Sequence, residues 1–230
     1  MTEFLILKLQ GPMQAWGEHS FEGTRPSGNF PTRSALLGLL GACLGIRRNE
    51  HARLQQLADS VLFAVRKDGR QVKTVWGEVK ALPVIKMTDY HTVLEARKEY
   101  EGIKPHDNSI QTWREYLLDA EYTVAIWENE GAVFPIAKLD AAIRKPIFTP
   151  YLGRRSCPLA QPLLRKRLTA QNAVEALRTV EPVGGVIYSD QKLDGSAGRN
   201  MRLRDVPMSG QPRQFASRTV YIHGGEHVSK

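Results

Sequence analysis

The sequence predicts an α+β fold, with a ferredoxin-like domain over residues 1–147 and a small β-rich region over residues 148–230. Two observations lead to this prediction. The first part follows the order strand, helix, two strands and helix, and a further pair of strands surrounds a polar excursion. The second part instead holds turn-rich segments, one short helix near residues 171–179 and a strand close to its end.

The opening strand is expected over residues 4–9, because Leu5, Leu7 and Leu9 share one face at a period of two residues. A loop rich in glycine and proline follows over residues 11–32 and carries several aromatic side chains. Loops of this length inside a compact domain are usually functional or disordered. The aromatic residues favour a functional loop.

A helix begins after this loop, where Thr32 or Ser34 can cap it and a stripe of leucines supplies an apolar face. Gly38, Gly41 and Gly45 recur at helical spacing, and each interior glycine costs about 1 kcal/mol relative to alanine. We therefore expect the helix to pack closely against a strand. Gly45 can alternatively serve as the C-cap.

The middle of the chain predicts two further helices and two strand pairs. A short helix over residues 49–60 precedes a strand, an Asp68-Gly69 turn and a second strand within residues 61–76. Residues 80–110 mix charges and aromatics, and we interpret them as an extended excursion or a long hairpin. Strand pattern returns after them, and a helix over residues 135–145 ends before Pro146.

The composition favours an anionic partner. The formal net charge is +8 over 230 residues, which is typical of proteins that bind nucleic acid or an acidic membrane surface, although charge alone does not separate these from other basic proteins. Cys43 and Cys157 belong to no CxxC pair, so buried thiols in a reducing, cytoplasmic setting are expected. We expect neither a signal peptide nor a membrane span.

Two glycine-containing segments carry candidate phosphate ligands. Arg25 and Arg33 flank a loop that runs into a helix start at Ser34, and helix N-termini attract phosphate oxygens. No Walker-type motif is present. The segment YLGRRSCP offers a second compact set of donors with an aromatic ring for base stacking: Tyr151, Gly153, Arg154, Arg155 and Ser156. Each segment alone could equally be a turn with solvated arginines.

Two further segments mix basic and aromatic residues. Residues 80–116 include Tyr90, His91, Trp113 and Arg114, a combination that suits single-stranded RNA and also the core of a protein interface. The pattern alone does not separate these two uses. Nearer the end of the chain, Arg213 and Arg218 lie in PRQFASR and can extend a basic surface or simply be solvated.

Signs of catalysis are few. The sequence has no HExxH motif, no GxSxG elbow and no acidic metal cluster, so we assign no catalytic residue, metal ligand or cofactor. One alternative keeps Tyr90 and His91 with Lys98 and Lys104 as a general acid and base set. Such a set could run metal-independent cleavage of RNA through attack by a 2′-hydroxyl.

A set of blocks in fixed order makes the sequence resemble the CasD-type subunits of type I-E CRISPR Cascade complexes. The blocks cover most of the chain, and the match is weakest over residues 67–86, 165–178 and 190–210. They are GPMQAWG, FEGTRPSGNFPTRSALLGLLGACLGI, DYHTVLEAR, IQTWREYLLDA, TPYLGRRSCPL, EPVGG, IYS and PRQFASR.

The resemblance implies an RRM-like ferredoxin domain of the RAMP superfamily with a protruding thumb hairpin over about residues 80–112. It implies a non-catalytic subunit that holds the repeat-derived 5′ tag of the guide RNA in antiviral defence. The implied partners are the backbone and large subunits of the complex, with target DNA met only indirectly. In related type I-C systems the equivalent subunit is an endoribonuclease that processes precursor RNA, which makes that activity the alternative.

The resemblance also implies where RNA would be met. The segments around Arg25 and Arg33 and around Tyr151–Ser156 should line the tag-binding face. The thumb, including Tyr90, His91, Trp113 and Arg114, should bend the RNA and meet the neighbouring subunit.

Overall fold

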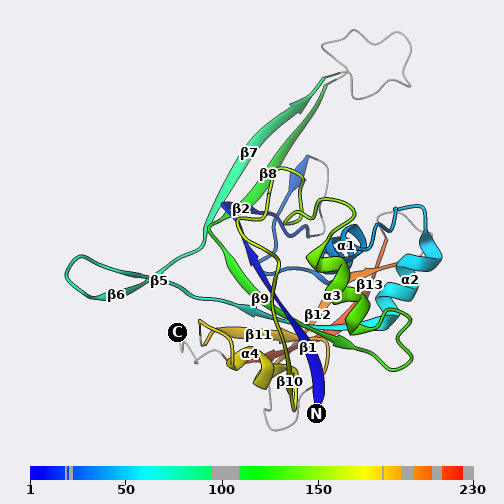
Figure 1. The fold of residues 1–230 in the computed structure, drawn as a ribbon. Coiled ribbons are helices and arrows are strands. Elements are labelled where there is room, and N and C mark those ends of the chain that lie inside the picture. Colours follow the sequence, from blue (N-terminus) through cyan, green and yellow to red (C-terminus); the bar gives the residue numbers. More distant parts are fainter. Residues whose placement is uncertain are drawn as a thin grey trace, which may run out of the picture.

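The computed structural model describes residues 1–18, 20, 23–94, 109–182, 184–192, 199–208 and 214–224. These residues form a mixed α/β structure that is mostly sheet, with few helices (Figure 1). The main sheet has seven strands in the order β10-β1-β9-β4-β11-β13-β12. A second sheet and a separate two-stranded hairpin leave this body.

One side of the main sheet is a four-stranded antiparallel unit. Its strands are β1 (Thr2–Gln10), β4 (Val61–Lys67), β9 (Glu121–Glu128) and β10 (Leu164–Ala170), and they lie in the order β10-β1-β9-β4. Helices α1 (Arg33–Cys43) and α2 (His51–Ser60) connect β1 to β4, and α3 (Ile136–Arg144) lies between β9 and β10. The predicted helices are therefore present.

Three later strands widen this sheet beyond β4: β11 (Val186–Ser189), β12 (Asn200–Pro207) and β13 (Phe215–His223). All strands after residue 148 thus belong to the same sheet as β1. The sequence predicted a strand close to the end of the chain, which is β13, and assigned no strand to the residues of β12. Arginine alternates with apolar residues in β12, which is the pattern of a strand with one buried face. Strand β13 pairs with β12 along its whole length.

The two faces of β1 enter two cores. Leu5, Leu7 and Leu9 lie in the larger core, together with buried residues of α1, α2 and α3, as their shared period predicted. Phe4 and Ile6 point to the opposite face, where α4 (Ala173–Arg178) covers the sheet. All five side chains are buried, so β1 contributes to the cores on both faces of the sheet.

Helix α1 is capped by Thr32, whose Oγ1 accepts a hydrogen bond from the amide of Ala35 at 3.3 Å. The C-cap residue of α1 is Leu44, and Gly45 follows it with a φ of +69°, so this glycine ends the helix from the position after the C-cap and is not the predicted C-cap itself. The predicted strand packing of the other glycines is wrong. A methyl group at Gly41 would contact Leu54 of α2 at 3.6 Å, and one at Gly38 would meet nothing within 4 Å.

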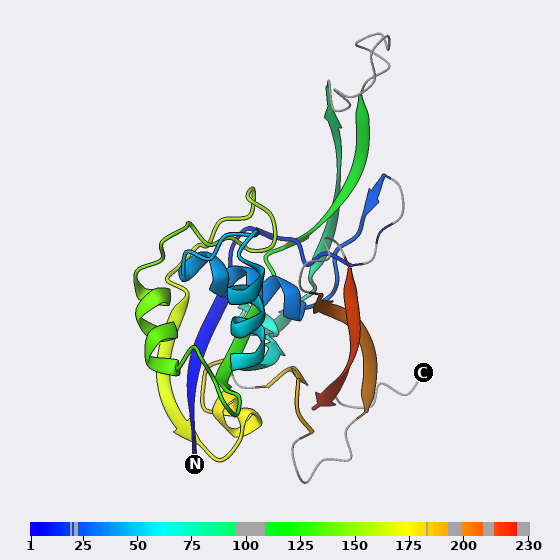
Figure 2. The same cartoon turned by 90° about the vertical axis from the view of Figure 1, so that its right-hand side faces the viewer.

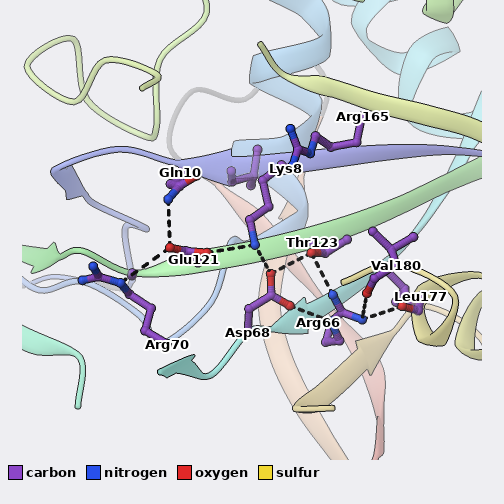
Figure 3. A network of polar contacts seen from close by, with 12 residues as sticks. Lys8, Gln10, Arg66, Asp68, Arg70, Glu121, Thr123, Arg165, Leu177 and Val180 are labelled. Carbon is purple, nitrogen blue, oxygen red and sulfur yellow. Dashed lines mark hydrogen bonds and ion pairs between the residues drawn. The ribbon is translucent and has the colours of Figure 1, made fainter. Parts of the chain in front are cut away.

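The predicted Asp68-Gly69 hairpin turn is also wrong. Strand β5 (Arg70–Lys73) pairs with β6 (Val79–Leu82) and not with β4. Asp68 lies buried, where its carboxylate accepts from Lys8 Nζ at 2.6 Å, Arg66 Nε at 2.6 Å and Thr123 Oγ1 at 2.7 Å (Figure 3). A carboxylate held by three donors at the centre of the sheet cannot stand at an exposed hairpin tip.

The same buried network joins distant parts of the chain (Figure 3). Arg66 donates from Nη1 to the carbonyls of Leu177 and Val180, which attaches α4 to the sheet. Arg66 Nη2 also contacts Thr123 Oγ1 at 3.1 Å, so its donors are directed to protein acceptors. Buried polar groups must be paired in this way, because an unpaired buried charge is strongly destabilising.

A long arm leaves the body as β7 (Ile85–Val93) and β8 (Ile110–Leu118), antiparallel to each other (Figure 1). This is the protruding hairpin expected near residues 80–112, although its paired strands reach residue 118. Residues 95–108 lie outside the described residues. The Gly- and Pro-rich loop contributes two short strands, β2 (Met13–Gln14) and β3 (Thr24–Arg25). Both of them pair with β8.

Cys43 and Cys157 are both free and buried, as expected. Burial raises the pKa of the Cys43 thiol to about 11. Of the helices in the described ranges, none combines the length and apolar character needed to cross a membrane.

Candidate nucleic-acid interface

A cavity of about 770 Å³ opens where four segments meet at the N-terminus of α1. Its walls come from the loop that precedes α1, the turn between α1 and α2, the YLGRRSCP segment and the joined ends of β12 and β13. We call this hollow the basic cavity, because three arginines line it. Its principal lining residues are Arg25, Ser34, Arg48, Gly153, Arg204 and Phe215.

Arg25 reaches the basic cavity from β3, which runs parallel to β8 in register with Arg114. Arg154 fixes this position: its Nη2 donates to the carbonyl oxygen of Arg25 at 3.1 Å and its Nη1 to that of Glu115 at 3.2 Å. The Arg154 guanidinium also lies 4.7 Å from the ring centroid of Tyr116. Arg154 is therefore a positioning residue for Arg25.

Gly153 allows the YLGRRSCP segment to close one wall of the cavity. Its φ is +89°, and a Cβ there would lie 1.7 Å from the carbonyl oxygen of Ala15. The neighbouring Leu152 accepts from the amide of Ala15 at 3.1 Å and is itself buried. Only glycine fits this close approach of two backbone segments.

The helix end contributes electrostatically. Ser34 and Ala35 of the first turn of α1 line the cavity, and no acidic residue lies in that turn. A helix N-terminus carries about half a positive charge, which attracts anions. The amide of Arg33 is already occupied, because it donates to Asp205 Oδ2 at 2.7 Å.

Arg33 and Arg218 form a separate group, the arginine clamp, with Asp190 and Asp205. Asp190 accepts from the guanidiniums of both arginines, and Arg218 also contacts both carboxylate oxygens of Asp205, at 2.7 and 2.8 Å. Arg33 Nη2 bonds the carbonyl oxygens of Ala58 and Val61. Burial raises the pKa of Asp190, and the two guanidiniums oppose that shift.

The clamp changes the expected role of two residues. The side chains of Arg33 and Arg218 are 12% and 17% exposed, and their donors point at protein acceptors. We therefore assign both side chains to the fold, joining α1 to the C-terminal strands, and leave them out of the candidate interface.

The basic cavity has a different charge balance from the clamp. Arg48 and Arg204 are exposed and Arg25 is half-buried, whereas the lining carboxylates are Glu18 and Asp205. Since Asp205 is engaged by Arg218, the lining keeps a positive excess. Such a cavity can accept an anionic group from solvent, with charge-assisted hydrogen bonds from guanidinium groups.

Sequence reasoning missed Arg48, Arg204 and Phe215. Arg48 follows Arg47 in the turn after α1, and paired arginines beside a capping glycine were a usable signal. Arg204 lies in a strand that was not recognised. Phe215 belongs to the PRQFASR block, in which only the arginines were predicted as RNA ligands. One of these, Arg213, lies outside the described residues.

A second group of expected residues lies on the arm. Tyr90 and Trp113 face each other across β7 and β8, with ring centroids 5.5 Å apart and exposures of 54% and 45%. Gly23 lies against Trp113, because a methyl group there would approach the ring to 3.1 Å. Arg114 donates from Nε to Thr112 at 3.0 Å. Two exposed rings supported in this way offer a stacking surface.

The remaining expected residues are dispersed. Arg155 and Ser156 are exposed and Tyr151 is half-buried, all next to Gly153. His91 lies on β7 with a buried Nδ1 that has no hydrogen-bond partner among the described residues. Its suggested partners Lys98 and Lys104 lie outside the described residues. Within the described part of the chain, no three histidine, cysteine or acidic residues gather as a metal site.

The family model described as CRISPR-associated protein (Cas_Cas5) matches residues 4–221. The chain therefore belongs to this family of CRISPR-associated proteins. It is 52% identical to the CRISPR system Cascade subunit CasD of Escherichia coli (strain K12), over the whole of both chains. The resemblance predicted from the sequence blocks is thus confirmed.

Solved structures agree with this membership. A chain of a CRISPR RNA-guided surveillance complex matches with a TM-score of 0.72 and 27% identity, covering 96% of this chain and 89% of the other. A crystal structure of a Cas protein shares the fold, with a TM-score of 0.61 and 23% identity, covering 96% and 93% of the two chains.

Proposed function

We propose that this chain is a subunit of a Cascade-type complex and holds the repeat-derived 5′ tag of the guide RNA in the basic cavity. The names of the relatives support the assembly: one is a Cascade subunit and another belongs to an RNA-guided surveillance complex. The observation that carries the tag proposal is the convergence of Arg25, Arg48 and Arg204 on the N-terminus of α1.

The cavity would act through phosphates. Guanidinium groups give charge-assisted hydrogen bonds to phosphate oxygens, and the helix end favours the same charge. Phe215 in the lining, and the Tyr90–Trp113 pair on the arm, supply faces on which unstacked bases can lie. RNA would thus be held by its backbone, with bases splayed onto rings.

The rest of the fold would serve assembly. We infer that β1, β4, β9 and β10 with α1 and α3 form a ferredoxin-like, RRM-like domain, because their order β10-β1-β9-β4 is that of a βαββαβ unit. Residues 148–230 would be its β-rich extension. The arm would meet the backbone and large subunits in the bacterial cytoplasm, and target DNA would be met through the complex.

The subunit would be non-catalytic. His91 is the candidate acid or base of the alternative endoribonuclease, and its ring lies on β7 of the arm, whereas the three arginines line the cavity. Incubation of the chain with repeat RNA in EDTA is expected to leave the RNA intact. Specific cleavage that His91→Ala abolishes would establish the endoribonuclease instead.

The test of the tag proposal is RNA binding by the full chain across a range of salt concentrations. Replacing Arg25, Arg48 and Arg204 together by glutamine should weaken binding of single-stranded tag RNA. Each neutralised phosphate contributes about 0.7 to the slope of log K against log salt, so the slope should shrink by about 2.

A matched control removes three exposed arginines that lie outside the cavity: Arg53, Arg144 and Arg165. The control changes the net charge by the same amount and should keep most of the slope. Equal losses in the two triple variants would show that the basic cavity has no special role. Circular dichroism and the denaturation midpoint establish that both variants fold.

A further inference from the structure

The outer face of the β12–β13 ribbon is a second basic surface. Cross-strand partners share a face, and the pairs on this face are Asn200 with Tyr221, Arg202 with Thr219, and Arg204 with Ser217. Five of these side chains are exposed and Tyr221 is half-buried. These six described side chains comprise two arginines, an asparagine, a serine, a threonine and a tyrosine, and none of the six is a carboxylate.

The opposite face of the ribbon is committed to the fold. Met201 and Leu203 pack against the larger core, Val220 is buried, and Arg218 belongs to the arginine clamp. Asp205 also serves the clamp, so its charge is neutralised there. On the outer side, α4 covers the sheet over β1, β4, β9 and β10, whereas the outward side chains of the ribbon are exposed apart from the half-buried Tyr221.

The ribbon face is continuous with the basic cavity. Arg204 lines the cavity, and its Nε donates to the carbonyl oxygen of Phe215, another lining residue, at 2.8 Å. In Figure 2 the ribbon, orange and red, stands on the side of the molecule opposite to α3. A chain that leaves the cavity past Arg204 meets Arg202 next, then Asn200 and Tyr221.

The chemistry of this face suits RNA better than protein. A protein interface needs a desolvated apolar or aromatic anchor, and here the one ring is half-buried. Arg202 and Arg204 are two residues apart on a strand, which separates them by about 7 Å along its axis. That separation is comparable to the step between successive phosphates of an extended strand. Serine and threonine hydroxyls add phosphate and sugar contacts.

We propose that the β12–β13 ribbon carries single-stranded RNA out of the basic cavity, binding its phosphates without reading its bases. This proposal rests on the proposed function, since it assumes that the cavity holds RNA. Arg204 contacts the phosphate at the mouth of the cavity, and Arg202 contacts the next one. Ser217 and Thr219 lie beside the same path.

The experiment compares two oligouridylate lengths on the full chain. A probe of about 4 nucleotides can occupy the cavity alone, whereas one of about 12 can extend along the ribbon. Arg202→Glu should weaken binding of the long probe about tenfold and reduce its salt slope by about 0.7, with the short probe unaffected. Arg165→Glu, on the opposite edge strand β10, makes the same charge change as a control.

The outcomes separate the two proposals. If the wild-type chain binds the short probe and Arg202→Glu leaves the long probe unchanged, the ribbon path is wrong and the cavity stands. If Arg165→Glu weakens the long probe as much as Arg202→Glu does, the effect is general charge and the ribbon path is also wrong. If the wild-type chain binds neither probe, the proposed function itself fails.

Discussion

The arginine clamp and the basic cavity lie on two sides of the same helix end, and both are built from arginines. In the clamp, Arg33 and Arg218 meet Asp190 and Asp205 and are largely buried. In the cavity, Arg48 and Arg204 are exposed. The difference lies in which arginines the carboxylates contact: Asp190 accepts from both clamp arginines and Asp205 from Arg218, although Asp205 also lines the cavity.

This difference shows how one residue type takes two roles. Burying a guanidinium is costly unless carboxylates and carbonyl oxygens replace the hydrogen bonds that it made to water. Once it is buried in this way, removing one of its partners is strongly destabilising. An exposed guanidinium keeps its hydration and contributes little to stability, so it stays available for a ligand. The three predictions below test this contrast, from the largest change in the free energy of unfolding to the smallest.

Asp190→Ala should have the largest effect on stability. Its carboxylate accepts from both clamp arginines and from the amide of Phe63 at 3.1 Å. Its loss leaves buried charge uncompensated, which costs about 3–5 kcal/mol of unfolding free energy. Urea denaturation measures this. Asp140→Ala, which removes the partner of the exposed Arg144, is the control and should cost less than about 1 kcal/mol. Similar losses in both variants would contradict the contrast.

Gly153→Ala should have an intermediate effect. The left-handed backbone and the overlap with the carbonyl oxygen of Ala15 strain any side chain there, so stability should fall by more than about 1 kcal/mol. RNA affinity should fall as well, because the cavity wall shifts. Gly38→Ala makes the same chemical change inside α1 with open space around it, and should stabilise by up to about 1 kcal/mol. Thermal unfolding of the two variants should therefore move in opposite directions.

Arg48→Gln should have the smallest effect on stability. The side chain is exposed, so the free energy of unfolding should stay within about 0.5 kcal/mol of the wild-type value. Its salt slope for RNA should nevertheless fall by about 0.7, the share of one phosphate. A large loss of stability would show that Arg48 supports the fold as the clamp arginines do.

The sequence correctly predicted those strands and helices whose apolar side chains recur at the spacing of a strand or a helix. The alternating leucines of β1 and the leucine stripe of α1 each led to an element that is present. The hairpin turn predicted at Asp68-Gly69 is wrong because the Asp68 carboxylate is buried against Lys8 and Arg66, and a local turn pattern contains no information on these partners. Strand β12 was missed because its arginines made it look like a loop, although they alternate with Met201 and Leu203.

The candidate site was only partly predictable for the same reason. Arg25, Ser34 and Gly153 were found, and they line one cavity. Arg33 could not be separated from Arg25 by sequence, since its role depends on Asp190, 157 residues further along the chain. Charge and local motif identify a candidate ligand, but long-range carboxylates decide whether it is available.

The route by which Arg25 is held has a mechanical consequence. Ser27, two residues after it, donates its amide to Glu115 of β8 at 3.0 Å, and Lys86 of β7 donates to the Ser27 carbonyl oxygen at 3.0 Å. The side chains of Lys86 and Glu115 therefore join the root of the arm to the loop that forms a wall of the basic cavity. A displacement of the arm would therefore be passed on to this wall of the cavity through the same hydrogen bonds.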